Sequence, residues 1–138
     1  MKILFMCVAN AARSQMAEGL AKAMLTKNDD IQSAGSKPKK VHPLAIKVLQ
    51  ELDIVITNHH SKSCDNLPTD FCNHVDYVIT LCAEEVCPVG VFPKAQRLHW
   101  PLKDPASDQM SEQEQLTAFR FTRDEIKKRL QEFIKDKS

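Results

Sequence analysis

The chain has 138 residues, of which 43% are hydrophobic and 27% charged, and its formal net charge is +1. This length and composition are ordinary for a globular protein, and we expect a single domain over 1–138. The near-neutral charge gives no support for nucleic acid as the main partner, and no apolar run approaches the roughly 20 residues that a membrane helix needs.

The number of cysteines bears on the compartment. Five is an odd number, which argues against the fully paired framework of a secreted protein. In a reducing compartment, cysteines are more often buried, catalytic or metal-binding. We therefore expect a cytoplasmic protein. Separately, we expect a monomer. The five are Cys7, Cys64, Cys72, Cys82 and Cys87.

The start of the chain predicts a strand, a tight loop and a helix. Residues 3–6 are apolar and of strand length, and apolar residues recur at helical spacing from Met16 to Met24. Between these two elements lies the run Cys7–Ser14. A loop between a strand and a helix gathers backbone N–H groups and the positive end of a helix dipole around one point, which is a site for an anion.

Cys7 and Arg13 mark the two ends of this loop. The dipole and the cation favour a thiolate at such a cysteine, and a guanidinium can bind two oxygens of a tetrahedral oxyanion. The Ser14 hydroxyl can reach back to the sulfur. A cysteine at the end of a buried strand is more often a small apolar residue, but the flanking elements favour a nucleophile that faces a bound oxyanion. The oxyanion-binding loop would comprise Val8, Ala9, Asn10, Ala11, Ala12, Arg13 and Ser14.

The middle of the chain predicts one more strand and one more helix. Residues 31–35 form a short strand that ends at a glycine, and a helix opens at Pro43 and ends near Asp53. The basic segment 36–41 is interpreted as a solvated loop, although its lysines could add positive potential near the anion site. Residues 54–73 are expected to form a loop. The histidines and cysteines of this region do not match a zinc template, and we interpret them as surface histidines and packed cysteines: His59, His60, Cys64, Cys72 and His74.

The second half of the chain completes the fold class. Val75–Cys82 is rich in β-branched and aromatic residues and suits a central parallel strand. A short strand at 97–100 follows, and then a closing helix at 111–135 that is opened by a capping box of Ser111 and Glu114. Strands that alternate with helices predict an α/β domain with an open four-stranded parallel sheet and helices on both faces.

That topology adds two candidate site residues. Parallel strands bring their carboxyl ends to one edge of the sheet, so Cys82 and Cys7, which each end a strand, can converge on a single pocket. Asp104, in the Asp-Pro pair after the last strand, can reach the same edge and act as a general acid. An Asp-Pro pair is equally typical of a turn, and the residues alone leave that choice open.

Cys7 to Glu18, read as Cys-x-x-Asn-x-x-Arg-Ser-Gln-Met-Ala-Glu, resembles the phosphate loop of the low-molecular-weight protein tyrosine phosphatases and of the arsenate reductases that share their flavodoxin-like fold. These families often carry Gly and Ser where this chain has Ala9 and Ala11, and many reductases carry a Cys at the position of Ala12. The resemblance implies that Asp104 supplies the acid. Some relatives hold a potassium ion near the loop, and the residues that match the positions used there are Asn10, Glu18 and Ser33.

The segment 81–88 resembles the redox segment of the thioredoxin-linked arsenate reductases, and residues 33–35, 99–100 with 104–105, and 123–126 add to the likeness. The resemblance implies a relay with no organic or metal cofactor. In it Cys7 attacks arsenate, Cys82 attacks Cys7, and Cys87 attacks Cys82. Thioredoxin would then reduce the last disulfide, and phosphate or sulfate would bind as analogues of arsenate.

Two other functions stay open. One is a phosphatase that acts on phosphotyrosine or a small phosphate ester and uses only Cys7, Arg13 and Asp104. The phosphatases lack the later cysteine pair, however, and usually place tyrosines after the Asp-Pro, where this chain has Ala106-Ser107. The other is a zinc-binding or redox-sensing module built on that cysteine pair, although two thiols alone make a poor structural zinc site.

Overall fold

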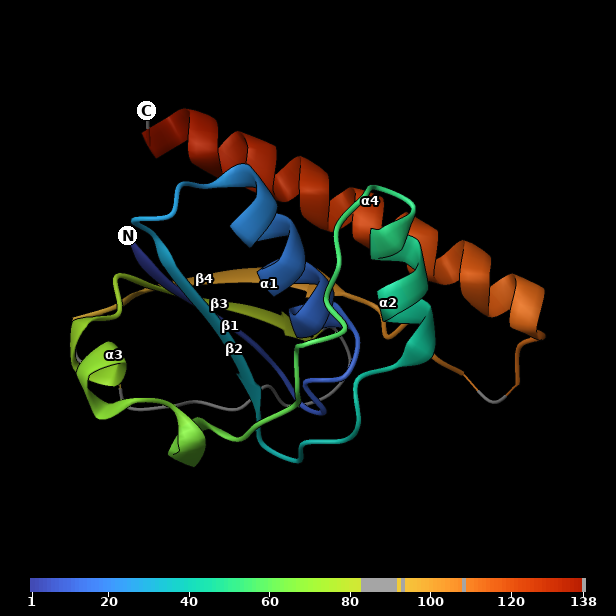
Figure 1. Cartoon of the computed structure of the whole chain (residues 1–138), viewed down its shortest axis with the longest axis horizontal. Coiled ribbons are helices and arrows are strands. Elements are labelled where there is room, and N and C mark those ends of the chain that lie inside the picture. The colour runs from blue at the N-terminus through green and yellow to red at the C-terminus, as the bar shows by residue number, and fades with distance from the viewer. Residues whose placement is uncertain (83–91, 93, 108, 138) are drawn as a thin grey trace.

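The computed structural model describes residues 1–82, 92, 94–107 and 109–137. Its four strands are β1 (Lys2–Cys7), β2 (Asp30–Gly35), β3 (Tyr77–Cys82) and β4 (Gln96–Leu102). They form one parallel sheet in the order β2-β1-β3-β4 (Figure 1). The predicted open four-stranded parallel sheet is therefore confirmed. The chain runs outward from β1 to β2 and then crosses back to β3, so the strand order reverses beside the carboxyl end of β1, where ligands bind in such sheets.

Helices cover both faces of the sheet, as expected. Three of them pack together on one face: α1 (Arg13–Met24), α2 (Pro43–Gln50) and the long α4 (Glu112–Lys137), which runs across the other two in Figure 1. The short α3 (Thr69–His74) packs on the opposite face through Phe71. The inner strand β1 is buried on both faces of the sheet. Ile3 and Phe5 belong to the hydrophobic core on the face of α1, α2 and α4, and Leu4 and Met6 belong to the core on the face of α3. This explains its continuous apolar sequence.

Several boundaries of the helices and strands agree with those predicted from the sequence, and others differ. The capping box is confirmed, since the Ser111 Oγ accepts from the Glu114 N–H and the Glu114 Oε1 accepts from the Ser111 N–H, both at 3.1 Å. The segment 54–73, expected to be a loop, contains a 3-10 turn at Cys64–Asn66 and the start of α3. Burial of Phe71 favours the helix there, a tertiary effect that the polar sequence hides.

The last strand is longer than predicted and includes Pro101. It lies at the edge of the sheet, where a residue without an N–H donor breaks no central ladder. Within the described part of the chain, no helix has the length and apolar character required to cross a membrane.

Candidate active site

The loop between β1 and α1 has the predicted strand–loop–helix frame. Cys7 is the last residue of β1 and Arg13 the first residue of α1, and their side chains are almost fully buried. Between them, Asn10 has a positive φ of 48°. Asparagine adopts this left-handed backbone more readily than most residues, so Asn10 allows the tight reversal that brings the two ends of the loop together.

A network of buried side chains lies behind the loop. The Cys7 Sγ lies 2.9 Å from the Ser14 Oγ, as the sequence suggested. The Asn10 Nδ2 donates to the Ser14 Oγ at 2.7 Å and to the Ser33 Oγ at 3.0 Å. Ser33 in turn donates to the Glu18 carboxylate at 2.5 Å. The network therefore ties Cys7 to both α1 and β2.

The segment after β2 braces the loop from outside. Three of the loop's carbonyl oxygens accept backbone N–H groups of this segment at 2.9 Å: Val8 from Lys37, Ala9 from Lys39 and Ala11 from His42. Gly35 allows this close approach, because a Cβ there would meet the Cys7 carbonyl oxygen at 2.8 Å and the Asn10 nitrogen at 2.9 Å. The bracing engages carbonyl oxygens that would otherwise repel an anion.

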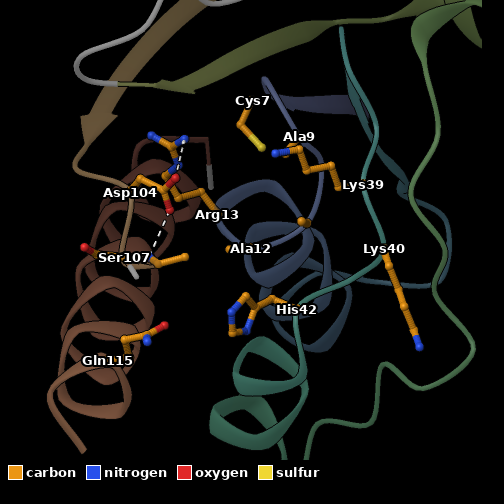
Figure 2. A pocket seen from close by; sticks show the side chains of 12 residues that line it. Cys7, Ala9, Ala12, Arg13, Lys39, Lys40, His42, Asp104, Ser107 and Gln115 are labelled. Carbon is orange, nitrogen blue, oxygen red and sulfur yellow. Dashed lines mark hydrogen bonds and ion pairs between the residues drawn. The ribbon is translucent and has the colours of Figure 1, made fainter. Parts of the chain in front are cut away.

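A pocket of about 360 Å³ opens over the loop (Figure 2). Three cationic side chains and one carboxylate line it, so its charge suits an oxyanion. Lys39 and Lys40 are exposed, as expected for a solvated loop, yet both line the pocket, and Figure 2 shows the Lys39 side chain running toward Cys7. The described lining residues are Cys7, Ala9, Ala11, Ala12, Arg13, Lys39, Lys40, His42, Asp104, Ala106, Ser107 and Gln115.

Arg13 and Asp104 meet at one side of the pocket. An Arg13 Nη1 donates to the Leu102 carbonyl at the end of β4 at 2.9 Å, and its Nη2 lies 4.0 Å from an Asp104 carboxylate oxygen. The other carboxylate oxygen accepts the Ala106 N–H at 3.0 Å, which is a turn contact. Asp104 thus makes the turn that its Asp-Pro sequence suggests and also faces the pocket, so the two interpretations are compatible.

His42 is a pocket residue that the sequence reasoning did not select. It is the N-cap of α2, and its Nδ1 accepts the Leu44 N–H at 3.1 Å, which leaves the ring proton on Nε2. Burial lowers the pKa of His42, and the nearby Asp104 carboxylate opposes that shift. A histidine directly before a proline at a helix start is a signal that could have identified this cap.

Glu18, at the end of this network, is buried and lies near three basic side chains. Its carboxylate lies 2.6 Å from the Lys22 Nζ, 3.5 Å from the His59 Nε2 and 4.0 Å from the Lys62 Nζ. Burial raises the pKa of Glu18, but hydrogen bonds from Lys22 and Ser33 outweigh it, and the pKa lies below its usual value. The interpretation of His59 as a surface histidine is wrong, because its side chain is 8% exposed. A buried carboxylate needs such partners.

Three other described cysteines, Cys64, Cys72 and Cys82, do not line the pocket. Cys82 is buried at the end of β3, beside β1. Cys64 and Cys72 pack half-buried against the core under α3, as predicted, and burial raises the pKa of both thiols. Cys87 lies outside the described residues. Among the residues that are described, no three His, Cys, Asp or Glu side chains are grouped to hold a metal ion.

Residues 2–137 match the protein family described as low molecular weight phosphotyrosine protein phosphatase. The chain belongs to this family. Its relatives include an arsenate reductase of Oceanobacillus iheyensis, which is 42% identical over 135 residues that cover 96% of this chain and 94% of the relative. A Bacillus subtilis arsenate reductase is 41% identical over 95% of this chain and 93% of its own.

Solved structures of this family share the fold. An arsenate reductase in its phosphate-binding state superposes with a TM-score of 0.79 at 32% identity, covering 99% of this chain and 98% of that one. A thioredoxin-dependent arsenate reductase of Corynebacterium glutamicum gives a TM-score of 0.73 at 31% identity over 98% of this chain and 60% of its own. The expected resemblance to the arsenate reductases of this family is therefore confirmed.

Proposed function

We propose that this protein reduces arsenate to arsenite. The observation that carries the proposal is the pocket over Cys7, which is small, cationic, and free of Tyr, Trp and Phe among its described lining residues. Such a lining suits an inorganic oxyanion better than the aromatic ring of phosphotyrosine. Relatives at about 40% identity are named arsenate reductase, and a family structure holds phosphate, which has nearly the same shape and charge as arsenate.

In the first step, the Cys7 thiolate attacks the arsenic atom of arsenate held by the loop amides and Arg13. Asp104 gives a proton to the departing oxygen, which leaves as water. The contact between Cys7 Sγ and Ser14 Oγ at 2.9 Å supports this role, because a hydroxyl that donates to sulfur stabilises the thiolate over the thiol. Lys39 adds positive charge at the same side of the pocket.

In the second step, the Cys82 thiolate attacks the Cys7 sulfur. The electron pair of the As–S bond passes to arsenic, which leaves as As(III), and a Cys7–Cys82 disulfide remains. The strand register supports this pairing: Met6 lies opposite Thr80, so Cys7 and Cys82 follow this pair at the ends of two neighbouring strands. Because successive strand residues face opposite sides of the sheet, the end of β3 must turn to bring the two sulfurs together.

In the third step, Cys87 attacks Cys82, releases Cys7 and forms a Cys82–Cys87 disulfide. A dithiol protein then reduces this bridge, and thioredoxin is the proposed donor, since one structural relative is described as thioredoxin-dependent. Hydrolysis of phosphate esters by Cys7, Arg13 and Asp104 is the second candidate. The family description and the shared pocket of these three residues favour it as a side activity.

The test is arsenate-dependent NADPH oxidation in the presence of thioredoxin and thioredoxin reductase. Wild type should turn over many times, Cys87→Ser at most once, and the control Cys64→Ser as wild type, because Cys64 packs against the core under α3. Absence of arsenate-dependent oxidation, together with p-nitrophenyl phosphate hydrolysis that survives Cys87→Ser, would reject the reductase and favour the phosphatase.

A further inference from the structure

The three residues that match a potassium position in relatives are assembled here, but their oxygens already have partners. The Asn10 Oδ1 accepts from the Gln15 Nε2 at 3.1 Å and from the Lys62 N–H at 3.0 Å. Ser33 accepts from Asn10 and donates to Glu18. The Glu18 carboxylate faces two ammonium groups. A potassium ion would have to displace these donors from the single carboxylate, so the residues present do not fit it.

Lys62 is held in place at both ends. Its backbone N–H donates to Asn10 at 3.0 Å, and its carbonyl accepts the Gly35 N–H at 3.0 Å. Its side chain is 14% exposed and ends 4.0 Å from a Glu18 carboxylate oxygen. Lys22, the other ammonium beside Glu18, is 47% exposed on α1. Lys62 is therefore the cation that is built into the buried side of the network.

We propose that the Lys62 ammonium supplies the positive charge that a potassium ion supplies in relatives, so that this protein holds its oxyanion loop without potassium. Lys62 is a positioning residue: it acts on Glu18, which orients Ser33, which orients Asn10 and through it Ser14 and Cys7. The effect on turnover rests on the proposed function, whereas the effect on folding does not.

Charge and geometry support the replacement of a potassium ion by the Lys62 ammonium. An ammonium and a bare potassium ion each carry one positive charge, and the Lys62 ammonium is tethered 4.0 Å from the Glu18 carboxylate. The tether avoids the entropic cost of capturing a free ion. Without Lys62, Glu18 would retain the more exposed Lys22 at 2.6 Å and His59 at 3.5 Å, and the space beside the carboxylate would be open to an outside cation.

The experiment compares Tm in potassium chloride and in choline chloride at equal ionic strength, followed by the kcat/KM for arsenate in both salts. Wild type should give the same Tm and the same kcat/KM in the two salts. Lys62→Gln, which removes the charge and offers an amide oxygen, should lose about 5 °C of Tm and about tenfold in kcat/KM in choline, and potassium should restore most of both. Lys62→Arg and the exposed-surface control Lys27→Gln should behave as wild type.

Two results would overturn the proposal. One is a Tm of the wild-type protein that is higher in potassium chloride than in choline chloride. This measurement does not depend on the folding of any variant. The other is a Lys62→Gln protein that is unchanged in choline or that potassium does not restore. If arsenate turnover is absent in all proteins while the Tm pattern holds, the proposed reaction fails and the role of Lys62 stands.

Discussion

Cys7 and Cys82 are both cysteines at the carboxyl end of a strand, yet their surroundings differ. Each ends a buried parallel strand, the two strands are neighbours, and each side chain is 2% exposed. Cys7 leads into a loop that is braced by hydrogen bonds, lines the anion pocket and contacts Ser14. Cys82 does not line that pocket. The end of a parallel strand therefore places a residue at the edge of the sheet where ligands bind, and the contacts of Cys7 with its loop distinguish it from Cys82.

This difference assigns an order to the two thiols in the proposed reaction. A nucleophile that attacks a charged oxyanion needs positive charge and hydrogen-bond donors around the substrate, and these surround Cys7. A thiol that attacks another sulfur needs only access to it and a sufficient thiolate fraction. The contrast predicts that Cys7 serves every reaction of the pocket and that Cys82 serves only the reductive one.

The largest expected effect comes from removing each thiol in turn. Cys7→Ser should abolish both arsenate reduction and any p-nitrophenyl phosphate hydrolysis, by about 10⁴-fold or more. Cys82→Ser should abolish arsenate turnover and leave ester hydrolysis within about twofold of wild type. Both activities are measured on the same preparations, with Cys72→Ser as the control. Equal loss of both activities in Cys82→Ser would erase the distinction between the two strand ends.

A smaller effect is expected from Ser14→Ala. This change removes the hydroxyl that contacts the Cys7 sulfur at 2.9 Å and leaves Cys82 untouched. The rate at which iodoacetamide alkylates Cys7 at pH 7 should fall, because the sulfur loses a hydrogen-bond donor that stabilises its thiolate form. Mass spectrometry of the alkylated peptides reports each cysteine separately. A parallel fall at Cys82 would indicate a general change in structure instead.

The smallest effect is expected at an ion pair remote from both strand ends. Hydrogen bonds from Arg120 and Arg123 of α4 hold the pKa of Glu51 at about 2, below its usual 4.5. Because the folded-state pKa is lowered, the stability that Glu51 contributes is present above pH 4.5 and is lost as the pH falls toward 2. Glu51→Gln should lower Tm by a few degrees at pH 7 and by less at pH 3.

The activity of that variant completes the comparison. Arsenate turnover of Glu51→Gln at 25 °C should equal that of wild type, since Glu51 lies at the α2–α4 contact and does not line the pocket. A Tm difference that grows as the pH falls would contradict the assigned sign. A loss of turnover without a loss of Tm would show that the anion loop is coupled to the helix contact.

Much of the fold and of the pocket could be predicted from local pattern. The strand–loop–helix of residues 3–24, the capping box of Ser111 and the parallel sheet are confirmed because each depends on residues adjacent in the sequence or on the alternation of strands and helices. The short helix α3 and the full length of β4 were not predicted. Both depend on contacts between residues far apart in the sequence. Phe71 packs into the core beneath α3, and β4 pairs with β3.

The sequence by itself determined the loop between β1 and α1, since Cys7, Asn10, Arg13 and Ser14 lie within eight consecutive residues where a strand passes into a helix. Only the tertiary structure decided what surrounds it. His42 enters the pocket as the cap of another helix, and Lys62 reaches Glu18 from 44 positions further along the chain. Such contacts depend on how the crossovers return to the sheet edge. The partners of a buried charge are the groups that lie near it in the folded protein, and these cannot be read from residue spacing in the sequence.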